Sequence, residues 1–203
     1  MLHIISTEPF KDLAILLSSS EGCSKLKLTR SSGPSPHLGA LLHFLDDRST
    51  TFDIELSSST THYTFGAKQY FTGKLASSVN NRKSCYLKPL SRYFATFDSF
   101  LYQPEIPLSG CQSLIGFQVT TTYEHRISVV GLKELQACLN AKVPALKALR
   151  PTSAEKLILL FVVPEPMAAS FRKMEFKGKA AHWGQKIAQF VLELPEPEVV
   201  RSY

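Results

Sequence analysis

The sequence has no long apolar run. The longest candidate covers residues 157–163 only, whereas a membrane-spanning helix needs about 18 apolar residues or more. The first residues, MLHIISTEPFK, also lack the cationic start and the long apolar core of a secretory signal. We therefore expect an intracellular protein that neither spans a membrane nor is secreted.

Cysteine motifs and phosphate-binding loops are missing too. The four cysteines are Cys23, Cys85, Cys111 and Cys138. They form no CxxC pair and have no histidine at zinc-finger spacing, so we expect reduced, mostly buried thiols and no structural zinc. The segment GAKQYFTGK at residues 66–74 lacks the glycine spacing of a P-loop and has no Ser or Thr after its last Lys, which excludes nucleotide binding of that kind.

Compositional bias is weak. The chain has 203 residues, of which 44% are hydrophobic and 20% charged, with ten glycines and twelve prolines. These values are typical of a globular protein and exclude a fibrous or disordered chain. The length favours one domain over residues 1–203. Within it we expect an N-terminal helix and loop extension over residues 1–35 and a tail over residues 195–203.

Basic residues exceed acidic residues by 23 − 17 = 6. They gather in two stretches. The first contains Arg82, Lys83, Lys88 and Arg92, and the second contains Arg172, Lys173, Lys177, Lys179 and Lys186. Together the stretches could form one groove for the backbone of a nucleic acid. The alternative is that they are ordinary solvated surfaces.

Apolar spacing predicts the elements of an α/β fold. Helical spacing predicts a helix over residues 6–17 and a second one carrying Leu38, Leu41, Leu42 and Leu45. Alternation with period two predicts a strand at residues 52–56, aromatic segments at 63–71 and 86–102 favour further strands, and residues 77–83 are expected to form an exposed loop.

The second half of the chain has clearer patterns. A strand at residues 113–122 is followed by a helix at 131–139, which Pro144 stops or kinks. The continuous apolar run at 157–163 is typical of a central strand covered on both faces, and alternation at 188–194 predicts a last strand. The order predicts the α/β class, with a central mixed β-sheet flanked by helices.

Polar residues interrupt two of the apolar β segments. Asp98 lies within an aromatic run, while Gln118 and Thr120 project to the same side of a strand. A lone buried carboxylate is costly unless it is paired or bound to a metal. The alternatives are that Asp98 caps a turn and that Gln118 pairs with a buried backbone group.

These residues, in this order, resemble the restriction-endonuclease-like PD-(D/E)XK superfamily, in the version carried by Crinkler and retrotransposon-hot-spot type effector proteins. The resemblance covers roughly residues 38–164. It rests on Asp98, Gln118-Val119-Thr120, His125, Gly131-Leu132 and the apolar strand ending in Val163-Pro164.

The resemblance implies a restriction-endonuclease-like core and metal-assisted phosphodiester hydrolysis. Mg²⁺ or Mn²⁺ would be held by Asp98, by the amide oxygen of Gln118 and by the backbone carbonyl of Val119. His125 would act as a base or contact a phosphate. The implied partner is nucleic acid, chiefly DNA bound through its backbone, with a host or partner protein as the other partner and the nucleus as the location.

One departure divides the functional prediction. The superfamily's third motif residue is a Lys that polarises the phosphate, whereas Thr120 carries no charge. Lys88, Lys133 and His125 are the candidates to replace it. The sequence therefore predicts a metal-dependent nuclease-like domain, or alternatively a catalytically degenerate one that binds nucleic acid or serves as a protein-interaction (effector) module.

Overall fold

The computed structural model describes residues 60–90, 94–106, 108–122, 127–140, 142–176 and 178–194, together with the backbone of three short strands nearer the N-terminus. The helix expected over residues 6–17 and the tail expected over 195–203 lie outside the described residues. Of the extension expected over residues 1–35, the described part includes only β1 (Lys25–Leu26).

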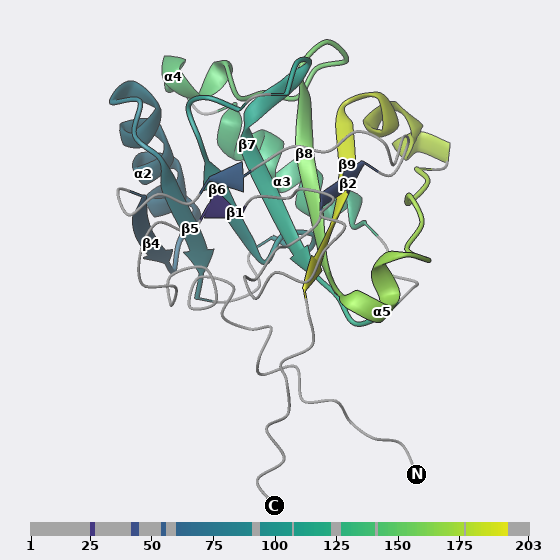
Figure 1. Ribbon diagram of the computed structural model, residues 1–203. Helices are drawn as coiled ribbons and strands as arrows, with labels where there is room; N and C mark the ends of the chain where they lie inside the picture. Colours follow the sequence, from purple (N-terminus) through teal and green to yellow (C-terminus); the bar gives the residue numbers. More distant parts are fainter. Residues whose placement is uncertain are drawn as a thin grey trace, which may run out of the picture.

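A seven-stranded mixed sheet forms the centre of the described part, in the order β2-β9-β8-β7-β6-β5-β4 (Figure 1). Its strands are β2 (Leu42–Phe44), β4 (Thr61–Phe65), β5 (Cys85–Pro89), β6 (Ser99–Tyr102), β7 (Cys111–Val119), β8 (Lys156–Pro164) and β9 (Ile187–Leu194). Strands β7, β8 and β9 are parallel to one another, and β4 is parallel to β5. Strand β6 is antiparallel to both of its neighbours, and β2 is antiparallel to β9.

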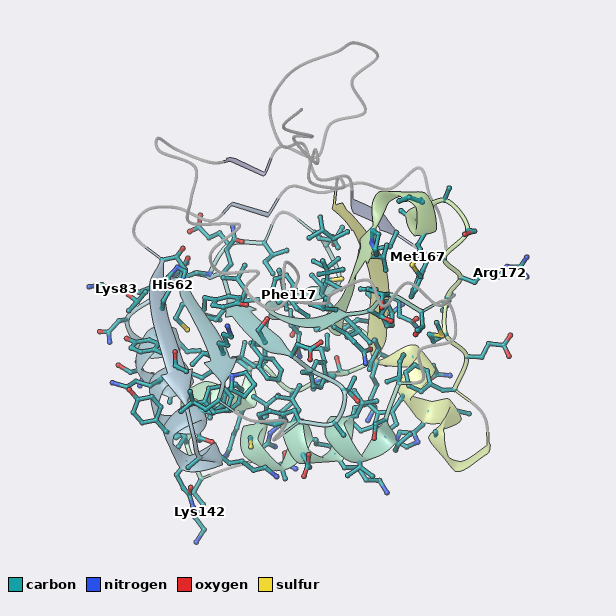
Figure 2. All side chains as sticks on the ribbon, turned by 90° about the horizontal axis from the view of Figure 1, so that it is seen from below. His62, Lys83, Phe117, Lys142, Met167 and Arg172 are labelled. Atoms are coloured by element: carbon teal, nitrogen blue, oxygen red, sulfur yellow. The ribbon has the colours of Figure 1, made fainter. Side chains whose placement is uncertain are left out.

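Helices cover one face of this sheet. The helices are α2 (Lys68–Asn80), α3 (Val129–Leu139), α4 (Pro144–Lys147), α5 (Glu165–Ala168) and the 3-10 helix η2 (Gly178–Gln185). Helices α2 and α3 pack into the same apolar cluster, while β1 and β3 (Ile54–Glu55) pair as a small antiparallel sheet on the opposite side (Figure 2). This arrangement confirms the predicted α/β class with a mixed sheet flanked by helices.

Strand β8 lies within the sheet between two parallel neighbours. All residues from Leu157 to Val163 are fully buried. Alternate residues join two separate apolar clusters, one on the helix-covered face and one on the other. A strand buried on both faces needs apolar residues at every position, which is why the run at 157–163 predicted it correctly.

Two predicted elements are wrong. Leu42–Phe44 forms strand β2 on the edge of β9, with Leu42 opposite Leu192, and is not part of a leucine-faced helix. Helix α2 occupies residues that were expected to be strand and loop. Its buried Phe71 and Leu75 are four residues apart, the spacing of one helix face, but neighbouring aromatics and Gly73 obscured that period.

Candidate metal and nucleic-acid site

Asp98 lies one residue before β6, at the edge of the sheet where the parallel strands β7, β8 and β9 end. The sequence showed only that Asp98 lies within an aromatic run, and the structure places it directly before the first residue of β6. Because β6 is antiparallel to β7, the first residue of β6 lies beside the last residues of β7.

Two hydrogen bonds join Asp98 to the end of β7. Its backbone N–H donates to the carbonyl of Phe117 at 2.8 Å, and its carboxylate Oδ2 accepts from the backbone N–H of Val119 at 2.7 Å. These contacts lie on either side of Gln118. Asp98 is exposed, and Phe117 marks the middle of this region in Figure 2. Asp98 and Gln118 are therefore on neighbouring chain segments.

Gln118 is a buried amide with an unsatisfied oxygen. Its side chain is 2% exposed, and its Oε1 has no hydrogen-bond partner among the described residues. Gln189 on β9 is equally buried, but its amide donates to the carbonyl of Met174 at 2.8 Å and accepts from the Met174 N–H at 2.9 Å. A buried acceptor without a partner costs free energy, so the environment of Gln118 favours a donor or a cation that the described residues do not supply.

Thr120 closes the turn that follows β7. Its hydroxyl oxygen accepts from the backbone N–H of Thr122 at 3.1 Å, and its own N–H donates to the carbonyl of Val162 at 3.0 Å. The side chain is 5% exposed. These contacts give Thr120 a local structural role, and its hydroxyl supplies no charge in place of the superfamily's Lys.

The segment that carries Asp98 is held by two glycines. A Cβ on Gly116 of β7 would lie 2.4 Å from the ring of Phe97, and a Cβ on Gly131 of α3 would lie 2.6 Å from the backbone nitrogen of Thr96. The hydroxyl of Thr96 also donates to the carbonyl of Ser128 at 2.6 Å, at the start of α3. The segment therefore fits closely between β7 and α3. Sequence reasoning missed Gly116, Phe97 and Thr96, because each acts through a residue that is distant in the sequence.

Among the described residues of the first basic stretch, Lys88 is the member nearest to Asp98 along the sheet. Leu87 pairs with Phe100, so Lys88 follows on toward Ser99, next to Asp98, and it is partly buried. Arg82 and Lys83 precede β5 and lie at the other end of that strand. Arg82 pairs with Glu105 at 3.6 Å, both side chains being exposed, and Lys83 is exposed.

The other basic residues named as candidates are less well placed or not described. Lys133 is exposed on α3. His125 and Arg92 lie outside the described residues, so their predicted roles stay predictions.

The second basic stretch is far from the first. Arg172 and Lys173 are exposed beyond α5, which packs on β8 and β9, whereas Lys83 lies near the β4 edge. Figure 2 shows Lys83 and Arg172 at opposite ends of the sheet. Lys177 and the side chain of Lys179 lie outside the described part. The described residues Lys83 and Arg172 therefore lie far apart, and the shared groove stays a prediction.

The predicted ligands suit a hard cation. Asp98 and Gln118 offer a carboxylate and an amide oxygen, which are donors that Mg²⁺ and Mn²⁺ accept. The unsatisfied Oε1 of Gln118 is the observation that supports the fit. Three or more His, Cys, Asp or Glu side chains do not converge anywhere in the described residues, so any other metal site built from such groups is not seen there.

Comparisons of the chain with protein-family models, with curated proteins and with solved structures gave no match. Among the described helices, none is long and apolar enough to cross a membrane.

Proposed function

We propose that the chain is a nuclease-like domain that holds a divalent cation at the end of β7 and acts on nucleic acid, hydrolysing phosphodiesters if it is active. The observation that carries this proposal is the pairing of Asp98 with the β7 backbone around Gln118, whose buried Oε1 has no donor among the described residues. DNA in the nucleus is the substrate and location that the family resemblance implies.

The order of the elements supports the same proposal. Asp98 precedes β6, Gln118 lies in β7, Gly131-Leu132 lie in the first turn of α3, and β8 follows in parallel to β7 and ends at Pro164. These are the residues and the order on which the resemblance rests. The close contact of Gly131 with Thr96 explains why a glycine is needed at this position, because a side chain there would keep α3 away from the segment that carries Asp98.

Asp98, Gln118 and the carbonyl of Val119 are the residues that would hold the cation. When bound, a divalent cation lowers the pKa of a coordinated water and stabilises charge on the phosphate. The protein's own contribution is orientation. The N–H of Val119 holds the Asp98 carboxylate against the end of β7, and Phe97 packed over Gly116 keeps the preceding residue in place.

Cleavage of plasmid and single-stranded DNA, with Mg²⁺ or Mn²⁺ and with EDTA, tests the reaction. We expect cleavage that needs the metal and falls by about 100-fold or more in Asp98→Ala, since loss of a catalytic charge removes stabilisation of the transition state. Glu105→Ala is the matched control, because Glu105 is an exposed acid paired with Arg82 at the far end of β5. Cleavage that survives in Asp98→Ala would remove Asp98 from the mechanism.

Metal binding has a readout that does not need activity. Millimolar Mg²⁺ or Mn²⁺ should raise the melting temperature of the wild type and of Glu105→Ala, because a ligand that binds the native state stabilises it. Asp98→Ala should show no such rise. Equal rises in all three proteins would place the bound metal elsewhere.

A second candidate is the catalytically degenerate module, which binds nucleic acid or a partner protein without cleaving. The favouring observation is that the Asp98 carboxylate already accepts from Val119 while Thr120 is tied into a turn and uncharged. This candidate predicts EDTA-insensitive binding with no cleavage.

If basic residues contact phosphates, replacing Arg172 and Lys173 with Gln should lower both the DNA affinity and its salt dependence.

A further inference from the structure

Strand β4 is the last strand of the sheet and pairs with β5 only. Alternate residues of β4 direct their backbone groups to the side opposite β5. The Thr61 N–H donates to the carbonyl of Ser84 at 3.1 Å, and the Leu90 N–H donates to the carbonyl of Phe65 at 2.8 Å. In a parallel pair, a residue directs both its N–H and its C=O to the same neighbour, so Thr61, Tyr63 and Phe65 bond to β5. The backbone groups of His62 and Thr64 therefore point outward.

This outer edge is open. His62 and Thr64 are exposed, and no described residue bonds to their outward N–H and C=O groups. The sequence of β4, THYTF, is rich in Thr and aromatic residues, which favour strands. It contains no Lys and no Pro, the residues that commonly protect an edge strand from pairing. The edge can therefore accept one more extended chain.

The stretch of sequence that contains this edge is basic. Residues 56–97 include no Asp and no Glu, and their basic residues are Lys68, Lys74, Arg82, Lys83, Lys88 and Arg92. Lys68 pairs with Glu134 at 2.8 Å and Arg82 with Glu105 at 3.6 Å, both acids lying outside this stretch. Lys74 lies beside the edge, because its Nζ is 4.9 Å from the ring centre of Tyr63 on β4 and 5.0 Å from that of Tyr70 on α2.

We propose that the outer edge of β4 binds an acidic peptide segment in extended conformation, which adds to the sheet as an eighth strand. The outward N–H and C=O groups of His62 and Thr64 pair with its backbone. Acidic side chains on its helix-facing side approach Lys74, and residues on its other side contact His62, whose ring lies 5.5 Å from that of Tyr86. This interaction goes beyond the nuclease proposal and does not depend on it.

Charge argues against a second copy of the chain as the occupant. A β4–β4 pairing would bring two acid-free, basic segments together, and like charges across an interface oppose association. A nucleic acid would match the charge but has no regular array of N–H and C=O groups to pair with a strand edge. An acidic extended peptide satisfies both the charge and the backbone.

The test uses the full chain and two labelled peptides of about ten residues, long enough to form a strand. One alternates Glu with Thr and Val, and the other has Lys in place of each Glu. Fluorescence anisotropy should show binding of the Glu peptide at least about tenfold tighter than that of the Lys peptide at low salt. Amide NMR signals of residues 61–65 should shift on addition of the Glu peptide.

Thr64→Pro removes an outward N–H without touching the bonds that Thr61, Tyr63 and Phe65 make to β5, and proline is tolerated at such edge positions. This substitution should lower the affinity for the Glu peptide about fivefold, which is the effect of one backbone hydrogen bond. The control Thr64→Val should bind the Glu peptide within about twofold of the wild-type affinity. Lys74→Gln leaves the strand intact and should weaken binding about threefold with a smaller salt dependence.

The proposal would be overturned if the Glu and Lys peptides bound equally well. It would also be overturned if the Glu peptide bound equally well to the wild type, to Thr64→Pro and to Lys74→Gln. So would a single-stranded oligonucleotide that shifts the amides of residues 61–65 when the Glu peptide does not, since the edge would then bind nucleic acid. A chain that dimerises and loses its dimer in Thr64→Pro would make a second copy the occupant. If Thr64→Pro unfolds, Lys74→Gln and the two peptides decide the question alone.

Discussion

The carboxylate of Asp98 accepts a 2.7 Å hydrogen bond from the backbone N–H of Val119. This bond gives an exposed acid a defined position beside a buried strand end. This contact therefore has two roles. It orients a proposed metal ligand, and it ties Asp98 to the end of strand β7.

Substitutions at Asp98 should separate its structural contribution from its charge. Asp98→Ala removes the acceptor of the Val119 N–H and should lower the free energy of unfolding by about 1–2 kcal/mol without metal. Asp98→Asn keeps an acceptor oxygen and should lose less than half of that. Urea unfolding with EDTA measures both. Equal losses in the two variants would mean that the charge, and not the hydrogen bond, stabilises this end of the sheet.

The two buried glutamines provide a matched comparison. Gln189→Leu should lower the free energy of unfolding by about 2–3 kcal/mol, because it leaves the N–H and C=O of Met174 without partners. Gln118→Leu should cost less than about 1 kcal/mol, since the lost Oε1 has no partner in the part of the chain that the structure describes.

Metal should reverse this order of sensitivity. With Mg²⁺ or Mn²⁺, Gln118→Leu should lose the stabilisation by metal that Gln189→Leu retains. Thermal unfolding with and without metal measures the difference. A large loss on replacing Gln118 in EDTA would show that its oxygen is satisfied by the protein or by bound water.

The parts of the fold that the sequence predicted are those with strong local patterns. The run at 157–163 predicted β8 because every one of its residues is buried, and the leucine spacing predicted α3 because Leu132, Leu135 and Leu139 are buried on one face. Helix α2 was missed because its exposed face carries Tyr70 and its apolar face is short. Strand β2 was missed because its pairing with β9 is made with a segment about 150 residues away, which no local pattern reveals.

In the candidate site too, local patterns predicted some features and not others. Strand alternation predicted that Gln118 and Thr120 share a side, and both are buried. The role of the Val119 N–H could not be predicted, since every residue except proline carries that group. Nor could the fit of Phe97 over Gly116, because it depends on how β6 and β7 pair.

Gly131→Ala tests the close approach of α3 to the segment carrying Asp98. The new Cβ would lie 2.6 Å from the Thr96 nitrogen, so the helix or the segment must move, at a cost of about 2 kcal/mol in the free energy of unfolding. Gly73→Ala is the control within a helix. Nothing lies within 4 Å of its Cβ, and Ala should stabilise α2 by about 0.5–1 kcal/mol.

The two changes should also differ in metal binding. Gly131→Ala displaces the segment that carries Asp98 and should weaken the rise in melting temperature caused by Mg²⁺ or Mn²⁺, whereas Gly73→Ala should leave it unchanged. Equal stability of the two variants would show that α3 does not press against Thr96 in solution.

Cys85 and Tyr102 are cross-strand partners on β5 and β6, and both are buried. Burial raises the pKa of the Cys85 thiol, and weaker effects of hydrogen bonds with Ser78 and with the Tyr102 backbone oppose it. Burial also raises the pKa of the Tyr102 phenol, and a negative charge on Cys85 would raise it further. Both groups therefore stay neutral in the folded protein at pH values where the unfolded chain has already lost these protons.

The sign of the pH dependence follows from this difference. Above the ordinary cysteine pKa of about 8.5 the unfolded chain binds fewer protons than the folded protein, so the free energy of unfolding should fall as pH rises from about 8 to 10. Cys85→Ala should reduce this fall, and Tyr102→Phe should reduce it mainly above about pH 10, where an unfolded tyrosine ionises. Urea midpoints from about pH 8 to about pH 11 measure the effects of both residues. A fall of the same size in wild type and in both variants would assign the alkaline loss of stability to other groups, because neither Cys85 nor Tyr102 would then change its proton occupancy on unfolding.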